Sequence, residues 1–175
     1  MLITLVLVGR TIPGFTELAD RVSRTFKARI TTKMIDFPLT RSFRAERKQY
    51  DADILLDELS HQIISEGPMV FLVREDIFSE PMNFVFGLTR GKACIVSLAR
   101  LDPRFYDPAE DNAIANARFK ERILKEVLHE LGHSLGLPHC EDKRCTQVFS
   151  DCIDGVDFKE KSFCAKCRKA LNLQD

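Results

Sequence analysis

The segment HELGHSLGLPHC, residues 129–140, gathers three of the four histidines of the chain. On a helix, His129 and His133 lie on the same face one turn apart, at a separation that one zinc ion can bridge. Gly136 can end the helix in a left-handed conformation, so that the chain turns back and offers His139 as a third ligand. The spacing therefore predicts a zinc site with three imidazole ligands and a fourth position open to water, as in catalytic zinc sites.

Glu130 lies beside these histidines without occupying a ligand position. A carboxylate placed there can accept the proton of a zinc-bound water, while zinc lowers the pKa of that water and polarises a carbonyl group. The pattern HExxH alone can arise by chance on an amphipathic helix with partly buried histidines. Because Gly136 and His139 follow at the required spacing, coincidence is a poor explanation, and we predict Glu130 as the general base of a hydrolase.

Five of the six cysteines crowd the C-terminal end of the chain. We see no export signal and expect a reducing compartment, where clustered thiols are metal ligands more often than disulfides. Four thiolates from two short pairs suit a closed, structural zinc site, whereas inert reduced cysteines would leave the order of this segment unexplained. The predicted ligands are Cys140 and Cys145 with the CxxC pair Cys164 and Cys167, and Cys152 is the rival for Cys140 or Cys145.

One cysteine and one histidine lie far from both clusters. Cys94 falls within a predicted strand, where we expect a small buried side chain. His61 falls on a predicted helix and is expected to be a surface or packing residue.

Strands and helices alternate along the chain and must position these groups. Apolar runs predict strands at residues 2–8, 28–37, 68–76, 83–90 and 92–101. A tight turn at Arg90-Gly91 suggests a hairpin between the last two, so the sheet should be mixed. Helical periodicity predicts helices at residues 15–26 and 49–64, with apolar faces of Phe15, Leu18, Val22 and Phe26 and of Leu55, Leu56, Leu59 and Ile63.

A long helix is predicted to carry the histidine cluster. The Asp-Pro-x-Glu order at residues 107–110 is a helix-start signal, and the amphipathic pattern then runs to Leu135. Its buried side holds Leu124, Leu128, Leu131 and Leu135.

Length and composition favour one globular α/β domain with a short appendage. The core is expected over residues 1–139, and the cysteine-rich residues 140–175 are too few to be held by a core of their own. With 26 basic and 26 acidic residues there is no net charge, so we expect no nucleic-acid or membrane partner. The opening MLITLVLV is interpreted as a buried strand, and we expect a cytoplasmic monomer.

The motif HExxHxxGxxHC, followed by a CxxxxC pair and a later CxxC pair, resembles the archaemetzincins, a branch of the metzincin-like zinc metallopeptidases. The segments RKQYDADILLDEL, REDIFSEPMNFVFGL and VSLARLDPRFY resemble those that precede the zinc helix in that family. The resemblance implies a compact mixed α/β domain with a small C-terminal zinc knuckle. It also implies one catalytic zinc on His129, His133 and His139 with Glu130 as base, and one structural zinc on Cys140, Cys145, Cys164 and Cys167.

One position departs from the family pattern. Gln147 stands two residues after Cys145, where the relatives usually carry a methionine that forms an apolar floor under the zinc ligands. A polar residue there is expected to change how the metal is seated or how tightly it is held. The leading prediction is a zinc-dependent aminopeptidase or restricted endopeptidase acting on peptides or a small protein. The alternative is a catalytically weak or inactive zinc-binding scaffold or interaction module.

Overall fold

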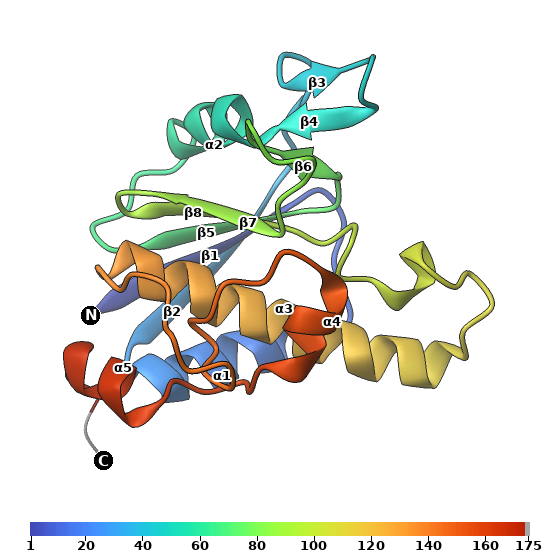
Figure 1. Ribbon diagram of the computed structural model, residues 1–175. Coiled ribbons are helices and arrows are strands. Elements are labelled where there is room, and N and C mark those ends of the chain that lie inside the picture. The colour runs from blue at the N-terminus through green and yellow to red at the C-terminus, as the bar shows by residue number, and fades with distance from the viewer. Residues whose placement is uncertain (174–175) are drawn as a thin grey trace.

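The computed structural model describes residues 1–173, in which helices cover both faces of a five-stranded sheet (Figure 1). The strands lie in the order β2 (Arg29–Ile35), β1 (Leu2–Val8), β5 (Met69–Val73), β8 (Ala93–Ser97) and β7 (Gly87–Arg90). The first four run parallel to one another, and the edge strand β7 runs antiparallel to β8. The predicted mixed sheet and the Arg90-Gly91 hairpin are confirmed.

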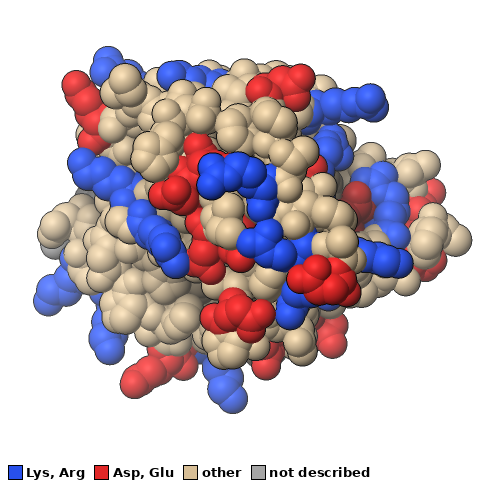
Figure 2. All heavy atoms as spheres, turned by 90° about the horizontal axis from the view of Figure 1, so that it is seen from above, with Lys and Arg blue, Asp and Glu red and all other residues tan. Residues whose placement is uncertain are grey.

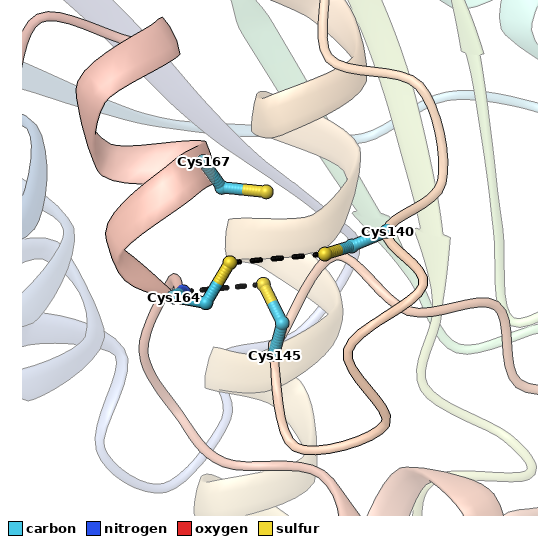
Figure 3. Close-up of side chains that lie close together, drawn as sticks. All are labelled: Cys140, Cys145, Cys164 and Cys167. Atoms are coloured by element: carbon cyan, nitrogen blue, oxygen red, sulfur yellow. Dashed lines mark hydrogen bonds between the residues drawn. The ribbon is translucent and has the colours of Figure 1, made fainter.

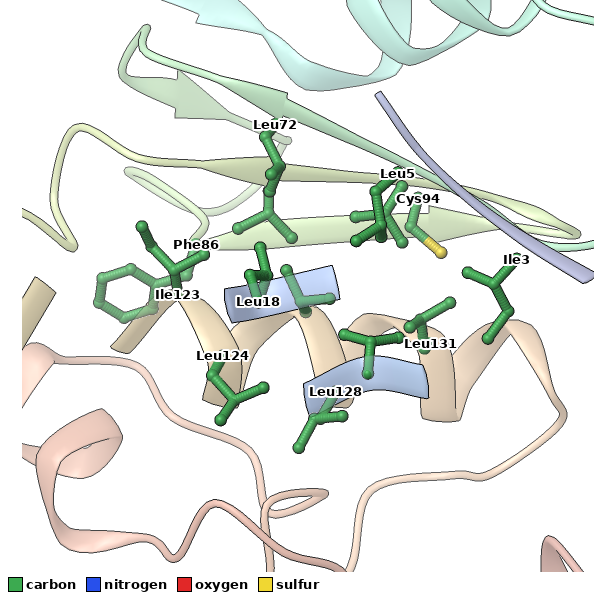
Figure 4. Packing of buried hydrophobic residues seen from close by; sticks show 14 of the residues in the cluster. Ile3, Leu5, Leu18, Leu72, Phe86, Cys94, Ile123, Leu124, Leu128 and Leu131 are labelled. Atoms are coloured by element: carbon green, nitrogen blue, oxygen red, sulfur yellow. The ribbon is translucent and has the colours of Figure 1, made fainter. Parts of the chain in front are cut away.

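Side chains of the central strands alternate between two hydrophobic clusters, one on each face of the sheet. Leu5 and Leu7 of β1 point to the face covered by α1 (Phe15–Phe26) and α3 (Asn112–Ser134). Val6 and Val8 point to the other face, which α2 (Ala52–Ser60) covers. Figure 4 shows leucines of the first cluster from the sheet and from α3 meeting between these layers. Because both faces are buried, the central strands read as continuous apolar runs.

The predicted helix over residues 49–64 is wrong at both ends. Residues Gln49–Asp51 form strand β4, which pairs with β3 (Phe43–Arg44) and β6 (Ile77–Phe78) in a second, three-stranded sheet. The Asp51 carboxylate accepts hydrogen bonds from the backbone N–H groups of Asp53 and Ile54, so the helix begins only after this N-cap. The small sheet depends on pairing between distant segments, which local sequence patterns do not predict.

Other boundaries differ as well: the strands predicted at residues 28–37, 68–76 and 92–101 are shorter, spanning Arg29–Ile35, Met69–Val73 and Ala93–Ser97. The strand predicted from residue 83 begins at Gly87, because residues 84–86 take an irregular path that buries Phe86 in the core. The long helix begins after Asp111, whose carboxylate accepts from Ala113 N and Ile114 N; the Asp-Pro signal upstream forms a separate turn. A short 3₁₀ helix, Pro103–Phe105, precedes that turn.

The C-terminal segment packs against α3 and contributes to the main core through Val156 and Phe163. It contains α4 (Ile153–Phe158) and α5 (Ala165–Ala170), which lie beside α3 and α1 in Figure 1. The Arg122 guanidinium of α3 donates to both carboxylate oxygens of Asp157 at 2.7 and 2.6 Å. The segment is therefore fixed to the helix that carries the histidines.

The surface mixes charges of both signs. Figure 2 shows basic and acidic side chains interspersed over the face seen from above. Several oppositely charged side chains of the protein form ion pairs, such as Arg41 and Glu58, with 3.2 Å between Nη1 and Oε1. Within residues 1–173, no helix is both long and apolar enough to cross a membrane.

Candidate metal centres and the cleft beside them

The three clustered histidines converge at the C-terminal end of α3. His129 and His133 face the same side of the helix, and Gly136 adopts a positive φ of 93° that turns the chain back. His139 then completes a group whose ligand nitrogens all lie within 4.8 Å of one another. Sequence spacing predicted this convergence.

The hydrogen bonds of the first two imidazoles orient their other nitrogens toward a shared point. His129 Nδ1 lies 3.0 Å from the carbonyl oxygen of Thr146, and His133 Nδ1 lies 2.8 Å from that of Leu137. Because a carbonyl only accepts, each Nδ1 carries the proton and each Nε2 is left with a lone pair. The two Nε2 atoms are 3.1 Å apart, close to the roughly 3.3 Å expected between two ligands of one tetrahedral zinc. Two Nε2 lone pairs that face each other at this distance fit a cation bound between them.

Burial also favours the protonation state that binds metal. It lowers the pKa of all three imidazoles, and for His129 the nearby Lys159 ammonium lowers it further. Neutral imidazoles are the form that coordinates zinc. His139 is exposed, so the site is open to solvent on that side.

Glu130 is buried between α3 and the edge strand β7. The Thr89 hydroxyl lies 2.6 Å from its Oε2, and a Cβ built on Gly87 would lie only 2.5 Å from its Oε1. Burial raises the pKa of Glu130 to about 8, an effect that the Thr89 hydrogen bond opposes. A divalent cation at the adjacent imidazoles would also oppose it, because positive charge favours the carboxylate form.

The four predicted cysteine ligands form the second cluster. Their sulfur atoms lie within 4.8 Å of one another and point to a common centre between α5 and the loop that follows α3 (Figure 3). Cys140 Sγ and Cys164 Sγ are 3.7 Å apart. The backbone N–H groups of Gln147 and Cys164 donate to Cys145 Sγ at 3.5 and 3.3 Å.

The four convergent sulfur atoms are the donor set of a closed, structural zinc site. Burial raises the pKa of Cys145 and Cys167, so these thiols resist ionisation unless a cation compensates the charge. Cys152 is exposed and lies outside the group of four. The cysteine and the histidine outside both clusters lie as predicted: Cys94 is fully buried, and His61 is exposed at the end of α2.

Gln147 lies fully buried beside Gly132 of α3, and its amide has no hydrogen-bond partner at either atom. Its carbonyl oxygen would be 2.0 Å from a Cβ built on Gly132, so the side chain fits only because residue 132 is glycine. A buried, unpaired amide is costly, and an apolar side chain would avoid that cost.

An open cleft of about 680 Å³ runs past the histidines and Glu130. The edge strand β7 forms one wall, and the segment around Phe149 and Asp151 forms the other. The Phe149 ring packs edge-on against His139, with 5.1 Å between the centroids. The site therefore combines three converging imidazoles, a carboxylate and space for a ligand.

Sequence reasoning missed four residues around the centre. Thr89 and Gly87 contact Glu130 from β7, and a buried ion pair joins Lys159 to Glu126 with 2.7 Å between Nζ and Oε1. No motif marks them, since they come from three separate segments. Glu126 precedes His129 by three residues on α3, whereas only the fold brings the other three residues to the site.

Comparison with known proteins matches the chain to peptidases. The family described as peptidase family M54 matches residues 15–173. The archaemetzincin of Sulfolobus acidocaldarius is 42% identical over 135 residues, which cover 76% of this chain and 74% of that protein. The archaemetzincin of Methanocaldococcus jannaschii is 39% identical over 139 residues, covering 78% and 73% respectively.

Solved structures agree over nearly the whole chain. The crystal structure of archaemetzincin from Methanopyrus kandleri superposes with a TM-score of 0.83 at 34% identity, covering 99% of this chain and 94% of that one. The crystal structure of a zinc-dependent peptidase from Methanocorpusculum labreanum gives a TM-score of 0.84 at 29% identity, with 97% and 100% covered.

Proposed function

The chain belongs to peptidase family M54, the archaemetzincins, and is a zinc metallopeptidase; from this premise we propose that Glu130 is the general base with which it hydrolyses peptide bonds. His129, His133 and His139 hold the catalytic zinc. The observation that carries the proposal is the convergence of three imidazoles beside one buried carboxylate at an open cleft.

Each residue has a distinct task in this reaction. Zinc, when bound at the three imidazoles, acts as a Lewis acid that polarises the scissile carbonyl and acidifies water. The carbonyl groups of Thr146 and Leu137 hold His129 and His133 in the tautomer that leaves Nε2 free for the metal. Glu130 accepts the proton of the attacking water and passes it to the departing amine.

The second zinc is structural, on the thiolates of Cys140, Cys145, Cys164 and Cys167. Four protein ligands leave no position for substrate, which distinguishes it from the histidine site. Cys140 directly follows His139, and its backbone N–H donates to the carbonyl of Gln147 at 3.0 Å. The thiolate site therefore also steadies the loop that presents the third histidine. Residues 1–139 and 140–175 are accordingly proposed as a catalytic core and a zinc-stabilised segment that supports it.

The test compares Glu130→Gln with the parent protein on a peptide library, with zinc content measured for both. The amide still hydrogen-bonds water but accepts no proton, so hydrolysis should fall by about 100-fold or more while both zinc ions remain. The control is Glu17→Gln, a comparable change at an exposed ion pair on α1, which should leave turnover unchanged. Turnover near the parent rate in Glu130→Gln would exclude Glu130 as the base.

The inactive-scaffold alternative is not favoured by membership of a peptidase family. Chelation separates the two functions directly. Stripping the zinc from the histidine site should abolish peptide hydrolysis, and adding zinc back should restore it. A zinc-loaded protein that cleaves no library peptide would support the scaffold instead.

A further inference from the structure

The edge strand β7 contacts α3 at Glu130. Thr89 Oγ1 lies 2.6 Å from Glu130 Oε2 and 3.1 Å from the Glu130 backbone carbonyl oxygen. On the neighbouring strand, Cys94 Sγ lies 3.4 Å from the same carbonyl. Strand and helix are thus joined at the residue assigned as the base.

The direction of the short hydrogen bond follows from the chemistry of its partners. The Thr89 hydroxyl is the donor to Glu130 Oε2, and a carboxylate acting as a base can only accept at that oxygen. At 2.6 Å the bond has the length of a charge-assisted one, which makes it the stronger of the two that this hydroxyl can form. Oε2 is therefore held in place, and Oε1 remains as the oxygen free to take a proton.

Gly87 completes the contact from the same strand. A Cβ there would lie 2.5 Å from Glu130 Oε1 and 2.7 Å from Cδ, far inside van der Waals distance. The carboxylate therefore occupies space that any larger residue would fill. Residues 87 and 89 point to the same face of the strand, so one short segment offers both the space and the donor.

We propose that Thr89 is a positioning residue for Glu130: its hydroxyl fixes one carboxylate oxygen so that the other stands ready to accept the proton of the attacking water. This rests on the proposed function, in which Glu130 is the base. Thr89 itself exchanges no proton with the substrate. Its contribution is to hold a flexible side chain in the one orientation in which proton transfer is efficient.

Two substitutions separate the hydroxyl from the shape of the side chain. Thr89→Val keeps the volume and removes the donor, so kcat should fall by about tenfold or more while KM changes by less than about twofold. Thr89→Ser keeps the donor and should recover kcat to within about threefold of the parent. Zinc content should stay the same in both. The control is Thr31→Val on the exposed strand β2, which should leave kcat and KM unchanged.

A second readout does not depend on activity. In crystals of the metal-free protein, Thr89→Val should show the Glu130 carboxylate rotated or spread over several rotamers, and Thr89→Ser should show it in place. Thr89→Ala serves the same comparison if the valine variant does not fold. A carboxylate that stays in place without the hydroxyl would overturn the proposal, as would parent-level kcat in Thr89→Val.

A double-mutant cycle distinguishes this inference from the proposed function. If Thr89 acts through Glu130, adding Thr89→Val to Glu130→Gln should cause no further loss of kcat. An inactive Glu130→Gln beside a fully active Thr89→Val would refute the positioning role and leave the base assigned. An active Glu130→Gln would refute the assignment of the base itself.

Discussion

The Gln147 amide packs against the backbone of Gly132, one residue before His133. A methyl group on Gly132 would lie 2.0 Å from the Gln147 carbonyl oxygen, and neither polar atom of this buried amide has a hydrogen-bond partner. The relationship links the position that the sequence analysis predicted to depart from the family pattern to the helix turn that presents two histidines.

Replacing Gln147 with methionine should retain the fold and hold the catalytic zinc at least as tightly. The thioether removes two unpaired polar atoms while keeping a similar length, so the cost of burying them disappears. Competitive zinc titration against a chelator, at one pH for both proteins, measures the change. Weaker zinc binding in Gln147→Met would show instead that the amide supports the site through a specific contact.

Gly132→Ala tests the same contact from the helix side. Its added methyl group would force Gln147 or the helix to move, so zinc should bind more weakly at the histidines while the thiolate zinc stays in place. Combining it with Gln147→Ala should relieve the clash and restore part of the affinity. If Gly132→Ala alone bound zinc at the histidines as tightly as the parent protein, the close packing of Gln147 against residue 132 would be contradicted.

Gly87→Ala should displace the Glu130 carboxylate without removing either zinc. The added Cβ would lie 2.5 Å from Oε1, and the carboxylate is the part that can move. Peptide hydrolysis should fall by about tenfold or more, because proton transfer depends on the placement of the base. Activity assays beside metal quantification check this outcome; parent-level kcat would mean that the carboxylate tolerates the shift.

The chain should bind two zinc ions, and Cys167→Ser should reduce the number to one. Serine is a poor replacement for a thiolate ligand, while the three imidazoles lie elsewhere. Metal quantification of the purified variants measures the number directly. Cys152→Ser is the matched control, since Cys152 is exposed and outside the cluster, and it should keep both ions. Loss of one zinc in that control would move the second site to include Cys152.

Breaking the buried pair of Lys159 and Glu126 should strongly destabilise the zinc-loaded protein. Lys159→Met leaves Glu126 as an unpaired buried charge, at a cost of about 3–5 kcal/mol in the free energy of unfolding. Denaturant unfolding at a constant concentration of free zinc measures this change in the free energy of unfolding. The control Lys120→Met breaks the exposed pair with Glu17 and should cost less than about 1 kcal/mol. Adding Glu126→Gln to Lys159→Met should recover stability, because the unpaired charge is removed. If stability did not recover, the destabilisation by Lys159→Met would come from lost packing of the lysine side chain instead.

The candidate metal sites could be predicted from the sequence because their geometry is largely local. Two histidines four residues apart on a helix must share a face, and Gly136 needs only its own positive φ to return His139. The members of each cysteine pair are likewise brought close by a short spacing, Cys140 and Cys145 in the loop after α3 and Cys164 and Cys167 at the start of α5. The central strands could also be predicted from the sequence, because strands buried on both faces consist of continuous apolar runs.

The groups around those sites were decided by the tertiary structure alone. Thr89 reaches Glu130 across 41 residues of sequence, because β7 pairs antiparallel with β8 and so lies along α3. Lys159 meets Glu126 because the C-terminal segment packs against that helix. The sheet of β3, β4 and β6 was missed for the same reason, since its short strands have no pattern of their own. Local spacing predicts which residues can bind a metal, whereas pairing between distant segments decides which residues hold and orient them.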